Sequence, residues 1–181
     1  MAIDKNTAGF IMEPIQGEGG LIPPSSGYLK KVRQLCNKHN ILLILDEIQT
    51  GSGRTGYFLA SQQEKVDADI VCLGKGLAGG IPVGATVFTQ KVADKIPKNI
   101  HTSTFGGNPL ACAGVIATLE KLDQPMLDKI KKTGAYFMNQ LRKIKSPLIS
   151  EVRGRGLMIG VEVKDKRNEI LKKMQDNGVL V

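Results

Sequence analysis

The first part of the chain alternates short apolar runs with a helical repeat of apolar residues. Four runs predict buried strands, at residues 8–15, 41–45, 69–73 and 83–89. Between the first two runs, Ser25 or Ser26 is expected to cap a helix that ends near Asn40. The inner face of this helix is predicted to carry Leu29, Val32 and Leu35 or Cys36. Continuous apolar strands joined through a helix are typical of parallel strands covered on both faces, which favours an α/β fold.

The pattern changes toward the C-terminus. Asn108 followed by Pro109 predicts the start of a helix that reaches Leu122, and its many alanines and glycines indicate close packing against a neighbour. A three-four repeat from Leu127 to Ile144 predicts a long amphipathic helix. The remaining elements are expected to be strands at 149–153 and 157–163, a helix at 166–177 and the start of a strand at 179–181.

Charge and cysteine content exclude several classes of function. The net charge of +8 comes from dispersed basic residues without a recognisable binding module, so we expect no nucleic-acid partner. The three cysteines form neither a disulfide framework nor a zinc pair, which favours a reducing, cytoplasmic setting without a metal site. Neither a signal-peptide pattern nor a bilayer-spanning apolar run is present, so no membrane partner is expected.

The stretch GSGRTG, residues 51–56, has the G-x-G-x-x-G pattern of dinucleotide-binding loops. In such loops the first glycine lies at the strand end and an acidic residue ends the following strand. Here residues 46–50 separate the strand from the glycine, and Asp67 and Asp69 precede the next strand. A nucleotide-binding α/β domain is therefore only a minor alternative.

Two ionisable side chains follow successive predicted strands. Asp46 follows the strand at 41–45, and Lys75 follows the next strand between Gly74 and Gly76. In parallel sheets ligands bind at this carboxyl edge. Each residue also has an ordinary interpretation, since an aspartate can cap a turn and a lysine can be solvated. Together they suit pyridoxal phosphate, because a carboxylate keeps its ring nitrogen protonated and a lysine amine holds its aldehyde as a Schiff base.

A third stretch, residues 103–109, combines hydroxyl groups and glycine amides ahead of a predicted helix N-terminus. Backbone N–H groups at such a position suit a phosphate. Taken alone, the stretch also fits an ordinary capped helix after a loop.

These stretches resemble the class III pyridoxal-phosphate-dependent aminotransferases in their order and separation. The resemblance lies in EPIQGEGG (13–20), LDEIQTGSGRTG (45–56), LGKGLAGGIPVGA (73–85) and STFGGNPLACAG (103–114), with VRGRGLMIGVEV (152–163) similar to the C-terminal strand pair. It implies fold type I, with residues 1–122 as part of the large α/β domain, whose sheet is mostly parallel. Residues 123–181 would form a linking helix and part of a small α+β domain.

The resemblance also implies roles for cofactor-binding residues. Lys75 would form the Schiff base with pyridoxal 5'-phosphate and move a proton during catalysis. Asp46 would pair with the pyridinium nitrogen of the cofactor. Ile48 would pack on one face of the ring, although an ordinary core position explains it equally, and Gln49 would hydrogen-bond the phenolic oxygen.

Further roles concern the substrate and a second subunit. Thr104 would bind the phosphate of the cofactor in the neighbouring subunit, so the resemblance implies a homodimer with shared active sites. Ser103 would lie close to the substrate, and Glu18 resembles the gate glutamate of the ornithine and acetylornithine branch. Glu13 is expected to be structural, and Arg153 and Arg155 to be solvated.

The implied reaction moves a terminal amino group to 2-oxoglutarate. The favoured donors are acetylornithine or a carrier-linked lysine or ornithine, in arginine or lysine biosynthesis, with ornithine or 4-aminobutyrate aminotransferase as the alternative. An aminomutase and a cofactor-free, non-catalytic domain of the same fold remain open. The family is about twice this length, so the resemblance implies a central-to-C-terminal fragment that alone transaminates poorly or not at all.

Overall fold

Four strands form the main sheet of the computed structural model, which describes residues 3–181. They are β1 (Gly9–Met12), β2 (Leu42–Asp46), β3 (Ile70–Leu73) and β4 (Ala85–Phe88), in this spatial order. The first three strands run parallel, and β4 runs antiparallel to β3. β1, β3 and β4 lie within the predicted runs, and β2 extends one residue beyond its run to include Asp46. The sheet is mostly parallel, as predicted for an α/β fold.

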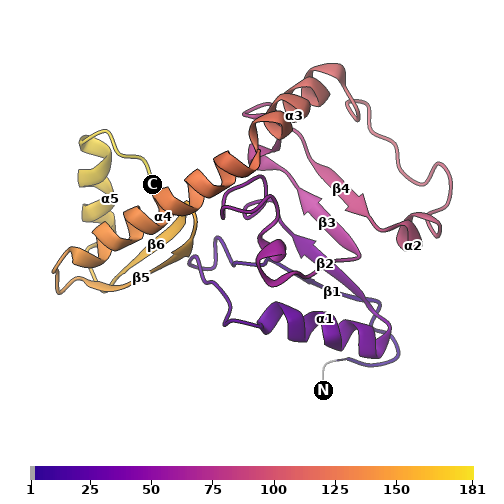
Figure 1. Ribbon diagram of the computed structural model, residues 1–181, viewed down its shortest axis with the longest axis horizontal. Coiled ribbons are helices and arrows are strands. Elements are labelled where there is room, and N and C mark those ends of the chain that lie inside the picture. Colours follow the sequence, from indigo (N-terminus) through magenta and orange to yellow (C-terminus); the bar gives the residue numbers. More distant parts are fainter. Residues whose placement is uncertain (1–2) are drawn as a thin grey trace.

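Helix α1 (Tyr28–His39) covers one face of this sheet (Figure 1). Its buried residues Leu29, Val32 and Cys36 pack in one cluster with Leu43 and Leu45 of β2. Cys36, rather than Leu35, completes the inner face. Full burial of each aliphatic side chain contributes roughly 1.5–3 kcal/mol, so this contact fixes β2 against α1.

The predicted serine cap of α1 is wrong. The N-cap is Gly27, whose φ is 78°, and no side chain caps the start of the helix. Glycine adopts this left-handed conformation without a steric penalty, and the chain uses it to turn into the helix. At the other end, Asn40 has a φ of 50° and its N–H bonds the last turn, as the predicted end of the helix implies.

Several short elements lie between β2 and α3. They are the 3-10 helices η1 (Ala60–Glu64) and η2 (Lys75–Ala78) and the short helix α2 (Gln90–Ala93). Helix α3 (Pro109–Lys121) starts as predicted, because Asn108 accepts the N–H of Ala111 at 2.9 Å. Its expected close packing is also confirmed, since a Cβ added to Gly114 would lie 3.0 Å from the Ala78 carbonyl oxygen.

Helix α4 (Gln124–Lys143) extends from the main sheet to a separate two-stranded antiparallel sheet (Figure 1). That hairpin consists of β5 (Ile149–Arg155) and β6 (Met158–Val163), and α5 (Arg167–Asp176) follows it. The predicted strand at 179–181 is absent, and Leu180 is 82 % exposed. Within residues 3–181 no strand pairs with this segment, so its apolar composition alone does not make it a strand.

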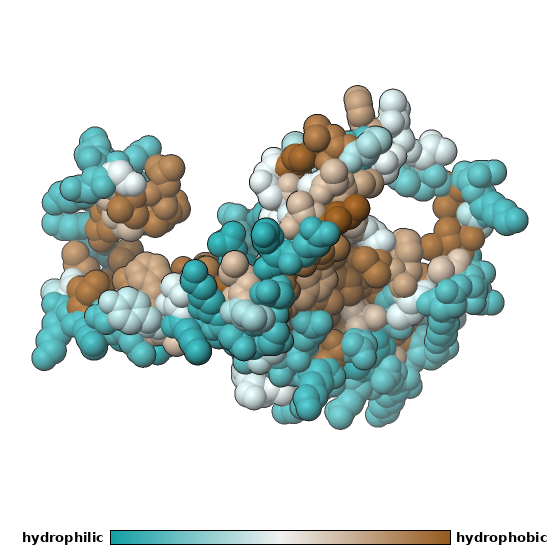
Figure 2. Space-filling model, turned by 45° about the horizontal axis from the view of Figure 1, so that its top comes forward, coloured by the Kyte–Doolittle hydropathy of each residue, from teal (hydrophilic) through white to brown (hydrophobic). Residues whose placement is uncertain are grey.

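One face of the main sheet carries an apolar row that crosses all four strands. The row consists of Ile11, Ile44, Ile70 and Phe88 in register. Its ends are open, since Ile11 is 64 % and Phe88 is 42 % exposed. Figure 2 shows apolar residues in brown across the middle of the larger lobe, between hydrophilic surfaces. No helix among the described residues has the length and apolar character needed to cross a membrane.

Candidate active site

Asp46 is the last residue of β2 and lies opposite Cys72 of β3. One carboxylate oxygen, Oδ1, accepts the N–H of Ile48 at 3.0 Å, so the residue does cap the turn that follows the strand. The side chain is half-buried and lines an open cavity of about 620 Å³. The capping role and a ligand-facing role are therefore compatible, because a carboxylate can accept several hydrogen bonds.

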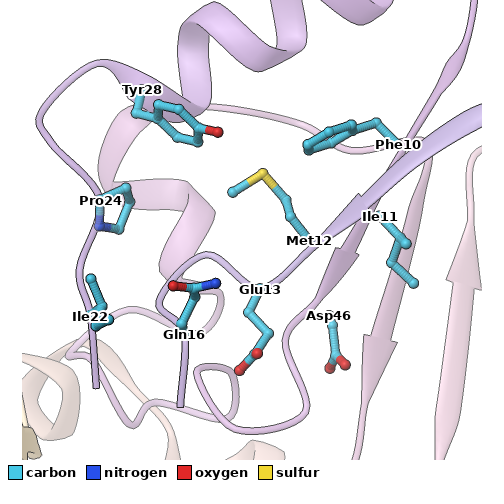
Figure 3. A pocket seen from close by; sticks show the side chains of 9 residues that line it. All are labelled: Phe10, Ile11, Met12, Glu13, Gln16, Ile22, Pro24, Tyr28 and Asp46. Atoms are coloured by element: carbon cyan, nitrogen blue, oxygen red, sulfur yellow. The ribbon is translucent and has the colours of Figure 1, made fainter. Parts of the chain in front are cut away.

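Glu13 faces the same cavity directly after the neighbouring strand β1. Figure 3 shows Glu13 and Asp46 extending to the same side, with Gln16 and Ile22 beside them. One oxygen of Glu13 accepts the N–H of Gly17 at 2.8 Å. This bond ties the start of the glycine-rich loop to the end of β1, which is the structural role expected for Glu13.

Lys75 is the first residue of η2, two positions after β3 ends. Its side chain is exposed and borders a second cavity of about 400 Å³ together with Ile48 and Gln49. Its backbone φ is 49°, a left-handed conformation that costs a residue with a side chain on the order of 1–2 kcal/mol. Such local strain concentrates at functional sites, where surrounding structure maintains it.

Ile48 and Gln49 line the same cavity as Lys75, and each lies close to a glycine, Gly74 and Gly17 respectively. Ile48 is 36 % exposed, so it is not an ordinary core residue, and its Cγ2 would lie 3.4 Å from a Cβ on Gly74. The Oε1 atom of Gln49 would lie 1.5 Å from a Cβ on Gly17. A side chain at position 17 would therefore displace the amide of Gln49.

Residues 51–56, the stretch with the dinucleotide-loop pattern, pack against the C-terminal part of the chain. A Cβ on Gly53 would lie 2.7 Å from Leu122, and one on Gly56 would lie 2.3 Å from Lys131. The carbonyl oxygen of Arg54 accepts the N–H of Leu157 at 3.0 Å. These glycines permit close contact between the two parts of the chain, which argues against a nucleotide-binding loop.

The model of the family described as "Aminotransferase class-III" matches residues 1–181. The chain belongs to the class-III aminotransferase family. It is 47 % identical over 181 residues to an ornithine aminotransferase of Oceanobacillus iheyensis, covering 99 % of this chain and 46 % of that protein. It is 50 % identical over 165 residues to an acetylornithine aminotransferase of Methanopyrus kandleri, covering 91 % of this chain and 42 % of that protein.

Solved structures of similar proteins confirm the fold of this aminotransferase chain. The ornithine aminotransferase from Toxoplasma gondii superposes with a TM-score of 0.93 at 45 % identity, covering 98 % of this chain and 44 % of that one. The acetylornithine aminotransferase from Elizabethkingia anophelis gives 0.90 at 41 % identity, covering 95 % and 47 %. The chain thus spans less than half the length of these relatives, and its fold is the α/β fold type I of their class.

The expectation of pyridoxal phosphate is confirmed at the level of the family, whose members depend on this cofactor. A structure of the Toxoplasma gondii enzyme is described with partial occupancy of pyridoxal phosphate at its active site. The side chains of this aminotransferase chain fit such a group. Asp46, the last residue of β2, offers a carboxylate in the first cavity. In the second cavity Ile48 offers an exposed apolar surface, Gln49 an amide and Lys75 an amine.

Three of the predicted site residues lie apart from this group. Glu18 is exposed in the turn of residues 17–21 and borders neither of the two cavities. Ser103 and Thr104 are exposed on the long loop between α2 and α3, which stands away from the sheet in Figure 1. The roles of all three residues stay predictions. Thr104 in particular was expected to bind the cofactor of a neighbouring subunit.

Sequence reasoning missed Glu47, the residue beside Asp46. Its side chain is fully buried, and its carboxylate accepts hydrogen bonds from the Thr50 hydroxyl and from the N–H groups of Ala60 and Ser61, each of the latter at 2.9 Å. These bonds fasten the turn that carries Ile48 and Gln49 to the start of η1. An acidic residue directly after Asp46, followed by threonine three positions later, was the available signal.

Proposed function

We propose that this chain forms the lysine-bearing part of an aminotransferase that moves a terminal amino group to 2-oxoglutarate. The proposed donors are acetylornithine or a carrier-linked lysine or ornithine, with ornithine or 4-aminobutyrate as the alternative. The observation that carries the proposal is the cavity in which Lys75, with its left-handed backbone, lies beside Ile48 and Gln49. The names of the relatives, ornithine and acetylornithine aminotransferase, support this substrate class.

Each residue at this edge of the sheet has a role that its position permits. Pyridoxal phosphate, when bound, supplies an aldehyde that reacts with amines and a ring that accepts electrons from the substrate carbon. Lys75 would hold the cofactor through its Nζ and return that amine as the base that moves a proton at the substrate carbon. Asp46 would keep the proton on the ring nitrogen, and Gln49 would donate to the ring oxygen.

Asp46 is oriented for this role by its own turn. Because Oδ1 is held by the Ile48 N–H at 3.0 Å, the carboxylate has a fixed direction at the end of β2. The same turn places Ile48 beside Gly74, the residue before Lys75. A single turn therefore orients the carboxylate and supplies the apolar surface on which the ring would pack.

The assembly and setting are part of the same proposal. Thr104 would contact the cofactor phosphate of a second subunit and Ser103 the substrate, in a homodimer with shared sites. Glu18 would act as the gate glutamate near the amino donor. We retain residues 1–122 as part of the large domain and 123–181 as part of the small one, and a cytoplasmic role in arginine or lysine biosynthesis.

Glutamate formation from 2-oxoglutarate tests the proposal. The full-length gene product is assayed with acetylornithine, ornithine and 4-aminobutyrate as alternative donors, and Lys75→Ala serves as the inactive reference. We expect the highest kcat/KM with acetylornithine and little or no turnover by the 181-residue chain alone, since it covers less than half of its relatives. Failure of all three donors, with pyridoxal phosphate bound, would contradict a free amino donor and leave only the carrier-linked lysine or ornithine of the proposal.

A further inference from the structure

Arg153 belongs to β5 of the C-terminal hairpin, yet its guanidinium contacts the glycine-rich loop near the start of the chain. Its Nε donates to the carbonyl oxygens of Gly20 and Leu21 at 3.1 Å each, and Nη2 donates to the Gly20 carbonyl at 2.7 Å. The side chain is 17 % exposed. The expectation that Arg153 is merely solvated is therefore wrong.

Two carboxylates hold the guanidinium from the hairpin side. Nη1 donates to Glu151 at 2.7 Å and also to Glu162. Glu151 and Glu162 are paired across β5 and β6, so both carboxylates reach the same nitrogen. Only the planar, five-donor guanidinium can bind two carboxylates and two carbonyl groups at once, whereas the ammonium of lysine cannot span them.

The loop held by Arg153, residues 16–22, contributes to both cavities of the site. Gln16 and Ile22 line the cavity that contains Asp46, as Figure 3 shows, and Leu21 lines the cavity that contains Lys75. The loop therefore forms a wall that the two cavities share. A shift of this wall would change the space beside both Asp46 and Lys75.

The far end of this loop depends on the hairpin for its position. Gln16 and Ile22 exchange backbone hydrogen bonds of 3.2 and 2.9 Å, which close the loop on itself. Leu21 has a φ of 57°, a left-handed conformation that disfavours a side chain. Gly160 of β6 leaves room for it, because a Cβ there would lie 3.0 Å from the Cβ of Leu21.

We propose that Arg153 is a positioning residue that fixes this loop and thereby sets the KM for the amino donor. The inference rests on the proposed function, because Glu18, the expected substrate-facing residue, lies within the loop. The C-terminal hairpin thus acts on the loop of residues 16–22 through Arg153, while Arg155 of the same hairpin donates to the Pro24 carbonyl just beyond that loop at 3.2 Å. Lys75 and Asp46 are not touched by Arg153 and keep their positions.

Hydrogen exchange of the loop tests the clamp directly. The 181-residue chain and its Arg153→Ala and Arg153→Lys variants are compared by mass spectrometry of peptides that cover residues 16–24. Arg142→Ala is the matched control, because Arg142 donates to the Val152 carbonyl of the same hairpin without contacting the loop. We expect at least about tenfold faster exchange in both Arg153 variants, because the guanidinium makes three charge-assisted hydrogen bonds to the loop carbonyl groups. We expect no change with Arg142→Ala. Unchanged exchange in peptides of β2 and β3 shows that a variant is folded.

Kinetics of the same variants in the full-length gene product test the link to the substrate. We expect the KM for the amino donor to rise about tenfold while kcat changes less than about threefold, because a displaced wall weakens binding uniformly. Loop exchange like that of the unsubstituted chain, an equal rise with Arg142→Ala, or a fall in kcat without a change in KM would each overturn the inference. If the unsubstituted enzyme transaminates no donor, the proposed function fails, and hydrogen exchange still decides whether the clamp exists.

Discussion

Removal of the Glu47 carboxylate is expected to destabilise the chain more than any other single change at the sheet edge. The Glu47→Ala variant leaves two buried N–H groups, those of Ala60 and Ser61, without their acceptor and also frees the Thr50 hydroxyl. Each unsatisfied buried group costs about 1–3 kcal/mol, so for three groups we expect a total loss of roughly 3–9 kcal/mol. Against a typical domain stability of about 5–15 kcal/mol, this loss is large.

The amide variant Glu47→Gln refines this prediction. One amide oxygen replaces two carboxylate oxygens, so at least one of the three hydrogen bonds is lost and an NH₂ group faces another donor. We expect a loss of roughly 2–3 kcal/mol. Urea unfolding followed by circular dichroism measures both variants, and Glu120→Gln on the exposed surface of α3 is the control, expected within about 0.5 kcal/mol of the unsubstituted chain. A Glu47→Gln variant as stable as that control would refute the reasoning.

Three further predictions concern other parts of the chain. Burial acts to raise the pKa of Asp69, but hydrogen bonds from Arg33 at 2.6 Å and from the Leu43 N–H at 2.8 Å outweigh it and hold the pKa below its ordinary value of 3.8. Because the pKa is lower in the folded state, the ionised Asp69 stabilises the fold above the unfolded pKa, and this stabilisation is lost as pH falls through the folded pKa. Asp69→Asn should therefore cost about 1–3 kcal/mol at pH 7 and progressively less below pH 3.8. Urea midpoints of the two proteins that differ equally from pH 7 to pH 3 would contradict this. Burial raises the pKa of the Cys36 thiol while Cys112 is exposed, so a thiol reagent at pH 8 should modify Cys112 rapidly and Cys36 only on unfolding, as peptide mass spectrometry can determine. Gly17→Ala should displace Gln49 and weaken pyridoxal phosphate binding by about tenfold, the effect of one lost hydrogen bond, and a titration with unchanged affinity would speak against that contact.

Local patterns in the sequence were sufficient for most of the fold. The burial of Leu29, Val32 and Cys36 follows from helical spacing, and the cap at Asn108 follows from its side chain and the proline after it. The strands were found because their apolar runs are continuous. The positions of Asp46 and Lys75 followed in turn, because Asp46 ends one parallel strand and Lys75 lies two residues after the next.

The sequence did not reveal one local turn and two sets of contacts between residues far apart along the chain. Gly27 replaced the expected serine cap because the approach to α1 needs a left-handed turn. Glu47 binds N–H groups 13 and 14 residues later, and Arg153 binds carbonyl groups 132 and 133 residues earlier. No local period or motif encodes such pairs, since the fold alone brings them together.

The apolar segment at 179–181 shows the opposite error. Its composition predicted a strand, but a strand needs a hydrogen-bonding neighbour, and none of the strands in residues 3–181 lies beside it. Leu180 and Val181 are each 82 % exposed.

Chemical mapping of the cofactor site tests the central claim most directly. The purified chain is mixed with pyridoxal phosphate, reduced with borohydride and digested, and the modified peptide is identified by mass spectrometry. We predict an absorbance band of the bound cofactor and a single modified residue, Lys75, with much weaker loading in Asp46→Ala and none in Lys75→Ala. Modification spread over the surface lysines, or equal labelling of Lys75→Ala, would contradict the assignment of Lys75 and Asp46 to the cofactor site.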